Sequence, residues 1–334
     1  MSEQAGLGDP SRAGRSRKWP VRALRHAWAA AAFLHLAACA PDGGVDPSAT
    51  ATDSAAVPPR HTRELIFAGQ RGAEPLVSVL AFSTTDDAGN RSREVRGWLG
   101  HGAQWDTFLN EQWTTGAHGS PWAVVPHGPL RIAAGDAAEV EALWFRRGGK
   151  SLALQLGPNL GQWSRGPASH VQLARGTLRV GGETSAGAVL ELVYLRRPGA
   201  DPPGVSEQLL LVGGDSLVLL LGSAAPADRP GTEAPAFALL RTADSTREWS
   251  GVQLTHRGGR PVLEARREIP AGWDLMVPAA GIRGRIEAHE FTAETGQVER
   301  TGRRGVEAHY TVSGWVEIEG ERVDVVGMAR HVVR

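Results

Sequence analysis

The 334-residue sequence is poor in cysteine and lysine and has none of the sequence motifs that most often identify an enzyme. It contains one cysteine, Cys39, and only two lysines. A single cysteine excludes an internal disulfide framework and a cysteine-based metal centre. The chain also lacks a Gly-x-Ser-x-Gly nucleophile elbow, a His-Glu-x-x-His zinc helix and a phosphate-binding loop. We therefore expect no cofactor and no metal site, and stability must come from an apolar core.

The chain has no excess of charge of either sign, with 36 basic and 36 acidic residues. Six of the basic and two of the acidic residues lie in residues 1–38, which leaves a net charge of −4 for the rest. This balance offers no electrostatic attraction to nucleic acid or to anionic lipid headgroups. The sequence therefore predicts no nucleic-acid partner.

Near the N-terminus, Ala27–Ala38 is apolar except for His35. It is too short to span a bilayer, which takes about 20 apolar residues. A basic flank before such a run and small residues before the cleavage point are typical of an export signal. The sequence thus predicts a signal peptide over residues 1–38. The basic flank consists of Arg12, Arg15, Arg17, Lys18, Arg22 and Arg25.

The end of this run, Leu36-Ala37-Ala38-Cys39, resembles the lipobox of bacterial lipoproteins. The resemblance implies a diacylglyceryl group on Cys39, cleavage before it, and membrane contact through lipid alone. Ala40 stands where an inner-membrane retention signal would place Asp, which implies the outer membrane in a cell that has one. The alternative is an ordinary secretory signal that happens to end beside a cysteine.

Residues 39–60 are rich in Pro, Ser, Ala, Thr, Asp and Gly, and they predict a flexible tether because they cannot bury enough apolar surface to fold. From residue 61 onward, short apolar runs separated by Gly, Pro or Asp predict an all-β fold, either barrel or sandwich. One helical patch is expected at Ala103–Trp113, from the spacing of its large apolar residues. The predicted strands are Glu64–Gln70, Pro75–Thr84, Val140–Arg146, Ser151–Leu156, Thr177–Val180, Ala188–Arg196, Ser206–Val212 and Ser216–Leu221.

The C-terminal region predicts a β-hairpin with Glu319-Gly320 as a two-residue turn. This register pairs Val316 with Val323 on one face. On the other face it pairs Glu317 with Arg322, so that apolar meets apolar and opposite charges meet.

The glycine spacing of this hairpin also occurs 138 residues earlier. Gly176 and Gly182 are separated by the same distance in sequence as Gly314 and Gly320. Half of the chain after the tether fits one antiparallel barrel of the lipocalin type. We therefore expect two lipocalin-like β-barrels in tandem, at residues 61–200 and 201–334, with a β-sandwich as the alternative.

The late strand pair, Tyr310-x-x-x-Gly314-x-Val316-x-Ile318-x-Gly320 running to Gly327, resembles the AttH-like and hydroxyneurosporene synthase (carotenoid 1,2-hydratase) group. The resemblance implies a tandem lipocalin-like fold with a cavity for an apolar polyene or acyl ligand. In some members it also implies hydration or cyclisation of that ligand. The chain departs from the carotenoid enzymes at Met328-Ala329-Arg330, where they carry more aromatic and acidic residues.

Tryptophans are the first candidates for ligand contacts, since each offers a large apolar face and one N–H donor. Trp98, Trp105, Trp113 and Trp122 fall within 25 residues. Trp105 and Trp113 fit the apolar stripe of the expected helix. Trp98 and Trp122 lie outside it and, with Trp315 in the late strand pair, are the predicted ligand-binding residues.

Two tripeptides, Glu287-Ala288-His289 and Glu307-Ala308-His309, each place Glu and His on one face of a strand. If the two strands are neighbours, Glu287, His289, Glu307 and His309 could perform acid–base catalysis. The alternative is the wet outer face of an antiparallel sheet, which shows the same alternation.

These features predict an envelope lipoprotein that binds an apolar small molecule, lipid-like or polyene-like, in a lipocalin-like cavity. One alternative is a hydratase, isomerase or cyclase acting on such a ligand. Another is a carbohydrate-binding or scaffold module of the envelope.

Overall fold

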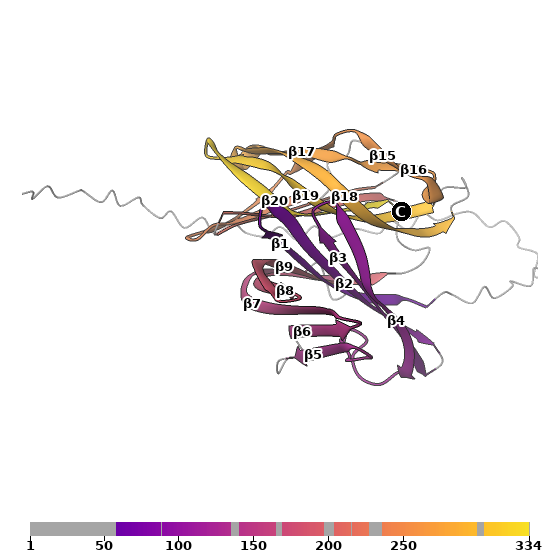
Figure 1. The fold of residues 1–334 in the computed structure, drawn as a ribbon. Helices are drawn as coiled ribbons and strands as arrows, with labels where there is room; N and C mark the ends of the chain where they lie inside the picture. The colour runs from indigo at the N-terminus through magenta and orange to yellow at the C-terminus, as the bar shows by residue number, and fades with distance from the viewer. Residues whose placement is uncertain are drawn as a thin grey trace, which may run out of the picture. The chain divides into compact units, whose positions relative to one another are not determined.

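A computed structural model describes residues 58–87, 89–134, 140–164, 169–196, 204–214, 216–226, 236–298 and 304–333. These residues form two nine-stranded antiparallel sheets and one two-stranded sheet (Figure 1). The predicted signal peptide, Cys39 and residues 39–57 of the predicted tether lie outside the described residues. The domain boundaries at 60/61 and 200/201 remain predictions.

The first sheet has the strand order β4-β3-β2-β1-β9-β8-β7-β6-β5. Each of its strands pairs antiparallel with its neighbour, and most neighbours are joined by short turns. The strands are β1 (Arg60–Arg71), β2 (Glu74–Asp87), β3 (Asn90–His101), β4 (Gln104–Gly116), β5 (Leu130–Ala134), β6 (Val140–Arg147), β7 (Lys150–Ser164), β8 (Ser169–Val180) and β9 (Glu183–Arg196).

The second sheet has the order β13-β12-β11-β10-β20-β19-β18-β17-β14. A small hairpin of β15 (Gly259–Val262) and β16 (Arg267–Pro270) stands apart from it, and the 3-10 helices η1 (Leu263–Ala265) and η2 (Pro278–Ala280) lie in connections. The strands are β10 (Gly204–Gly213), β11 (Leu217–Pro226), β12 (Ala236–Arg241), β13 (Thr246–Ser250), β14 (Gln253–His256), β17 (Gly272–Val277), β18 (Ile282–Val298), β19 (Arg304–Ile318) and β20 (Glu321–Val333).

The two large sheets repeat one topology. In each, the first strand lies beside the last strand, with the next three strands on one side and the remaining strands on the other. Each large sheet also has a glycine of its last strand that packs closely on the backbone of its first strand. A Cβ on Gly187 would lie 2.2 Å from the carbonyl oxygen of Ala68, and one on Gly327 would lie 2.1 Å from that of Leu210. The all-β tandem architecture is thus confirmed. In each sheet, only glycine fits at this point of the pairing between the last strand and the first.

The C-terminal hairpin has the predicted register, with Val316 opposite Val323 and Glu317 opposite Arg322. Glu319 and Gly320 have φ values of 54° and 86°. Positive φ at both central residues is the mark of the tight turn that suits the twist of a β-hairpin.

The expected helix at Ala103–Trp113 is wrong, since these residues belong to the turn before β4 and to β4 itself. Gly97 pairs with Leu109 and Trp98 with Thr107, so Phe108 is an extra residue in a β-bulge. The bulge breaks the simple alternation of the strand. Residues on either side of it therefore pack against different clusters, with a spacing that imitates a helix.

Three apolar clusters hold the fold together, and the middle one joins the two sheets. One cluster lies inside the first sheet, and another lies inside the second. The middle cluster contains Ile66 and Val79 of the first sheet with Leu210 and Met328 of the second. Strands β1 and β10 are therefore buried on both faces, which explains why their sequences are continuous apolar runs.

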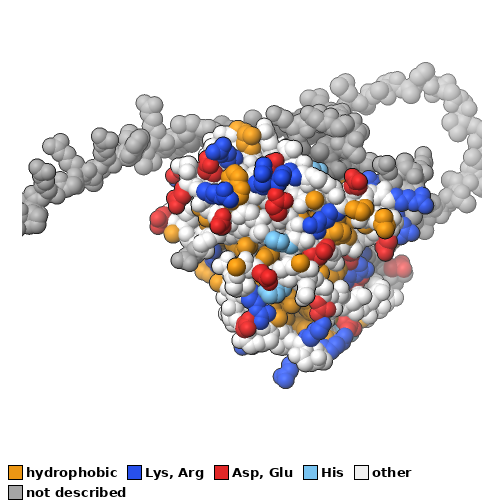
Figure 2. Space-filling model, turned by 45° about the horizontal axis from the view of Figure 1, so that its top comes forward, with side chains coloured by type: hydrophobic (Ala, Val, Ile, Leu, Met, Phe, Trp, Pro, Cys, Tyr) orange, Lys and Arg blue, Asp and Glu red, His pale blue; other side chains and the backbone are white. Residues whose placement is uncertain are grey.

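Basic and acidic side chains are intermingled over the face shown in Figure 2. The described part of the chain holds no helix that combines the length and the apolar character required to cross a membrane.

Candidate functional site

A pocket between the two sheets collects more of the predicted site residues than any other described pocket. We call it the inter-sheet pocket. It is narrow, with a volume of about 30 Å³, enough for about two water molecules. Trp98, Glu307 and His309 line it together with nine other residues: Arg60, Thr62, Glu64, Ala81, Ser83, Glu94, Arg96, Tyr194 and Glu294.

The alternation of each strand brings these side chains to the pocket. On β19, Ala308 and Tyr310 point into the second sheet's core, so Glu307 and His309, which alternate with them, face the first sheet. On β3, Val95 faces the first sheet's core and Trp98 packs in the cluster between the sheets. The pocket therefore needs both sheets, because each contributes only one wall.

His309 is buried at the base of the pocket, with 4% of its surface exposed. Its ring stacks on that of Trp98, with the ring centroids 6.1 Å apart and the planes at 23°. Its Nε2 atom has no hydrogen-bond partner among the described residues. Burial lowers the pKa of His309 to about 4, because it disfavours the charged ring more than nearby Glu307 favours it. His309 is therefore neutral near pH 7 and can accept or donate a hydrogen bond.

Arg330 of β20 ties the two walls together. Its Nη2 donates to Glu307 Oε1 at 2.5 Å and to the Tyr194 hydroxyl at 3.2 Å. The Tyr194 hydroxyl in turn donates to Glu64 Oε1 at 2.5 Å. Burial alone would lower the pKa of Arg330, but the carboxylates of Glu307 and Glu64 outweigh it and raise the pKa well above its usual value. The arginine thus stays charged inside the protein.

Arginines and carboxylates also form the outer rim of the pocket. Arg60 donates to Glu94 at 2.6 Å, and Arg96 bonds both Glu94 and Glu294 of the second sheet. The side chains of Arg60 and Arg96 are each 36% exposed. Glu294 is 39% exposed, so these three side chains of the rim reach solvent and are well placed to move when a ligand enters.

The structure places Glu287 and His289 away from this pocket. Strands β18 and β19 are neighbours, but Glu294 lies opposite Glu307 and Thr292 lies opposite His309. Both Glu287 and His289 are exposed. Glu287 pairs with Arg257, and His289 bonds Ser313 Oγ at 2.7 Å. These contacts show the solvated strand face that was the alternative for the first tripeptide.

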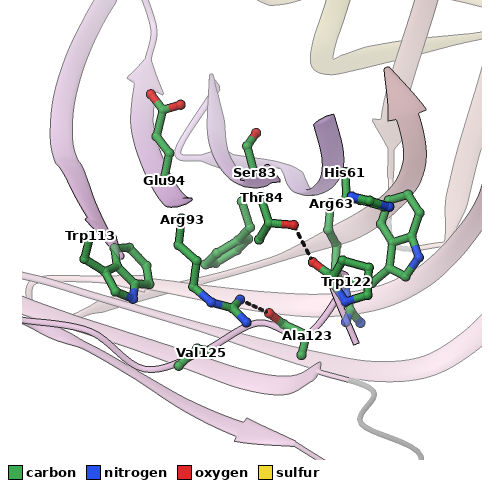
Figure 3. A pocket seen from close by; sticks show the side chains of 12 residues that line it. His61, Arg63, Ser83, Thr84, Arg93, Glu94, Trp113, Trp122, Ala123 and Val125 are labelled. Atoms are coloured by element: carbon green, nitrogen blue, oxygen red, sulfur yellow. Dashed lines mark hydrogen bonds between the residues drawn. The ribbon is translucent and has the colours of Figure 1, made fainter. Parts of the chain in front are cut away.

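Trp122 lines a different pocket, at one end of the first sheet's interior (Figure 3). Its ring meets His61 edge-on, with the centroids 4.6 Å apart. The segment that carries Trp122 is held down by Thr84, which donates to the Pro121 carbonyl, and by Arg93, which donates to the Ala123 carbonyl. This pocket has a volume of only about 10 Å³.

The three predicted ligand-binding tryptophans do not come together. Trp98 is 7% exposed in the inter-sheet cluster, and Trp122 packs on His61. Trp315 is half-buried on β19, with the Arg322 guanidinium 4.6 Å from its ring centroid. Trp98 and Trp122 thus do not form the flat, exposed pair that a carbohydrate-binding face would require.

The sequence patterns did not single out Glu64 and Tyr194, which line the pocket, or Arg330, which bonds both of them. Two of them had a usable signal, because a charged residue inside a buried strand needs a partner. Glu64 stands directly before Leu65-Ile66-Phe67, and Arg330 follows Met328-Ala329. Pairing across the two sheets, however, depends on how the sheets pack, which no local pattern shows.

A wider hollow of about 650 Å³ lies over strands β5 to β9, beside the 43% exposed Trp144. Its charged lining residues, Glu141 and Arg179, are both exposed. It contains none of the predicted site residues. The buried and titratable side chains make the inter-sheet pocket the better candidate for specific recognition.

No family model matches the sequence, and no curated protein matches it. Solved structures do match. A protein described as AttH from Nitrosomonas europaea aligns with a TM-score of 0.55 and 13% identity, over 88% of this chain and 98% of that one. CghA, crystallised with Sch210972, aligns with a TM-score of 0.50 and 10% identity, over 83% of this chain and 88% of that one. The chain therefore has the AttH-like fold of two lipocalin-like units in tandem.

Proposed function

We propose that this protein binds an amphiphilic small molecule in the inter-sheet pocket, with an apolar, conjugated part against Trp98 and a polar group at His309. One observation carries the proposal. A buried, neutral histidine with an unpartnered Nε2 atom, among the described residues, lies against a tryptophan face in a pocket built by both sheets. Buried polar atoms without partners are uncommon in folded proteins, so they mark sites where a ligand or water completes the bonding.

The size of the pocket sets a condition on binding. At about 30 Å³ it cannot hold a polyene or acyl chain without rearrangement. Arg60, Arg96 and Glu294 are the partly exposed residues of its rim, so their displacement is the least costly way to open it. We therefore expect affinity to depend on the salt concentration, because the ion pairs at the rim must loosen as the ligand enters.

Calorimetric titration of the full chain with polyenes and fatty acids tests the proposal. Trp98→Phe keeps an apolar ring but reduces the stacking face, and His309→Ala removes the polar contact. Each should weaken binding by about tenfold, which corresponds to about 1.4 kcal/mol. His289→Ala removes an exposed histidine on β18 and serves as the matched control. Absence of binding across the panel, or equal affinity of His309→Ala and wild type, would overturn the proposal.

A second candidate function is acid–base chemistry on the bound molecule, such as hydration, isomerisation or cyclisation. The lowered pKa of His309 favours it, since a neutral imidazole at pH 7 can accept a proton. Glu307 on the same strand face would favour the protonated ring as it forms. Mass spectrometry of each bound compound after incubation tests this function. Conversion by wild type that His309→Gln abolishes, with binding retained, would support it, and unchanged ligand would exclude it for that compound.

We further propose that the protein is exported and attached to the cell envelope through a lipid on Cys39. The lipobox-like motif and the basic flank support this location. Cys39→Ser should move the protein from the membrane fraction to the soluble fraction of the envelope. A variant that stayed in the membrane fraction would show that the anchor is not this cysteine.

A further inference from the structure

A second group of titratable side chains, two of them buried, lies inside the second sheet, away from the inter-sheet pocket. Glu207 of β10 and His331 of β20 are direct cross-strand partners. His256, the last residue of β14, reaches the same carboxylate. We call this group the Glu207 cluster (Glu207, His256 and His331).

The three donor atoms converge on a small volume. His256 Nε2 lies 2.7 Å from Glu207 Oε1, and His331 Nδ1 lies 2.5 Å from the same oxygen. One carboxylate oxygen and one nitrogen of each ring all lie within 4.8 Å of one another. Ligands about 2.0–2.2 Å from a tetrahedral Zn²⁺ lie about 3.3–3.6 Å apart. Shifts of less than about 1 Å would therefore bring the three atoms to coordination distance.

Burial and support around the cluster suit a metal centre. The side chains of Glu207 and His331 are only 5% and 3% exposed, so their geometry is fixed by the surrounding core. The indole N–H of Trp273 donates to Glu207 Oε2 at 3.1 Å, which orients the carboxylate and leaves Oε1 toward the rings. Hydrogen bonds of this kind hold metal ligands in place in known centres.

The cluster also has an entrance and unsatisfied polar atoms. The His256 side chain is 44% exposed, so an ion can arrive from solvent on its side. His331 Nε2 and the Tyr310 hydroxyl are buried without hydrogen-bond partners among the described residues. The Tyr310 ring packs edge-on against Trp273, with the centroids 5.2 Å apart. If the Glu207 cluster were only a structural hydrogen-bond network, we would expect the polar atoms around it to be satisfied as well.

From this geometry we propose that Glu207, His256 and His331 bind a divalent transition-metal ion, with Zn²⁺ as the representative ion. Two imidazoles and one carboxylate are a ligand set that such ions accept, and three protein ligands leave a fourth position for water on the solvent side of His256. The other three-residue group, Glu64, Glu307 and His309, is a poorer site because the Arg330 guanidinium already occupies Glu307 Oε1 at 2.5 Å. A cation there would be repelled by the arginine.

Zinc content and cobalt spectra of the full chain, purified in mild detergent and stripped with a chelator, test the site. Wild type should take up about one Zn²⁺ per chain, and Co²⁺ should give the visible absorption of a low-coordinate nitrogen–oxygen site. His256→Ala should weaken Zn²⁺ binding more than about 100-fold, since even supporting residues contribute 10–100-fold. Because His256 is half-exposed, this variant should fold. Glu207→Gln removes a second proposed ligand and should also weaken Zn²⁺ binding.

Two matched variants separate the proposal from its alternatives. His289→Ala removes an exposed histidine elsewhere and should bind Zn²⁺ like wild type. Glu307→Gln alters the other group and should also leave Zn²⁺ binding unchanged. The proposal is overturned if wild type takes up no metal, or if His256→Ala binds as tightly as wild type. It is equally overturned if the loss follows Glu307→Gln instead, and the Glu207 cluster would then be a structural hydrogen-bonded unit.

Discussion

Trp98 and His309 lie with their ring centroids 6.1 Å apart and their planes 23° from parallel, although one belongs to the first sheet and the other to the second. Each residue points away from the core of its own sheet. The contact exists only because the outer faces of the two sheets pack together through a shared apolar cluster. The duplicated fold therefore creates a site that neither of its halves contains.

The first prediction concerns the protonation of His309. Its pKa is about 4 in the folded protein, below the ordinary value of 6.5. Between these two values the unfolded chain takes up a proton and the folded protein does not, so stability falls as the pH drops from about 6.5 to 4. The loss should reach about 3 kcal/mol at the lower end. Urea unfolding from pH 4 to pH 7 measures it.

The matched variant is His309→Gln, which cannot titrate. It should show a flatter stability profile over the same pH range than wild type does. NMR titration of the His309 ring provides a direct measurement. A folded-state pKa above 6 would contradict the buried environment described for this ring.

The second prediction concerns Arg330. Arg330→Met would remove the cation that pairs with the buried carboxylates of both Glu64 and Glu307. Removing one partner of a buried ion pair costs about 3–5 kcal/mol. Arg283→Met is the control, because Arg283 and Glu317 form a largely exposed pair that should contribute no more than about 1 kcal/mol. Chemical denaturation of both variants gives the comparison.

A triple variant completes this test. Replacing Glu64 and Glu307 by Gln in the Arg330→Met background removes the two buried negative charges that Arg330 balanced, so it should recover much of the lost stability. If the triple variant is no more stable than Arg330→Met, the loss comes from packing of the arginine side chain and not from charge.

Much of the fold was predictable because strands leave local patterns. The eight predicted strands all coincide with observed strands, the last of them from Leu217 onward. The register of the C-terminal hairpin was also predictable, because a two-residue turn fixes which residues face each other.

The helix prediction failed for a specific physical reason. Phe108 is the extra residue of a β-bulge, and a Cβ on Gly97 would lie 2.7 Å from its ring. Beyond the bulge, Leu109 and Trp113 pack inside the first sheet, whereas Trp105 packs between the sheets. A change of face within one strand produces spacings of three and four, which a periodicity argument assigns to a helix.

The candidate sites were less predictable than the fold. The sequence singled out Trp98, Glu307 and His309 for separate reasons, and only the packing of the sheets brings them together. Glu207, His256 and His331 carry no motif, because three strands far apart in the sequence supply them. Such sites depend on long-range pairing that single-sequence patterns do not contain.

The third prediction concerns the glycines at which the last strand of each large sheet packs on the first strand. Gly327→Ala would place a Cβ 2.1 Å from the Leu210 carbonyl oxygen, so the backbone of β10 or β20 would have to shift. We expect the free energy of unfolding to fall by about 1–3 kcal/mol. Gly182→Ala is the control, since nothing lies within 4 Å of its added Cβ. It should be neutral or stabilise the protein by about 0.5 kcal/mol.

The fourth prediction concerns a hydrogen bond between the sheets. The Thr311 hydroxyl of β19 donates to the Gly102 carbonyl at 2.6 Å, and both residues are buried. Thr311→Val keeps the shape but leaves that carbonyl without its donor, which should cost about 1–3 kcal/mol. It should also speed amide exchange in the turn around Gly102, because that turn would be less firmly held to the second sheet. Thr246→Val, at an exposed position, should stay within about 0.5 kcal/mol of wild type. Equal exchange rates in wild type and Thr311→Val would mean that apolar packing alone holds the turn. The pocket lined by Trp98 and His309 would then owe its shape to the cluster of Ile66, Leu210 and Met328 rather than to this bond.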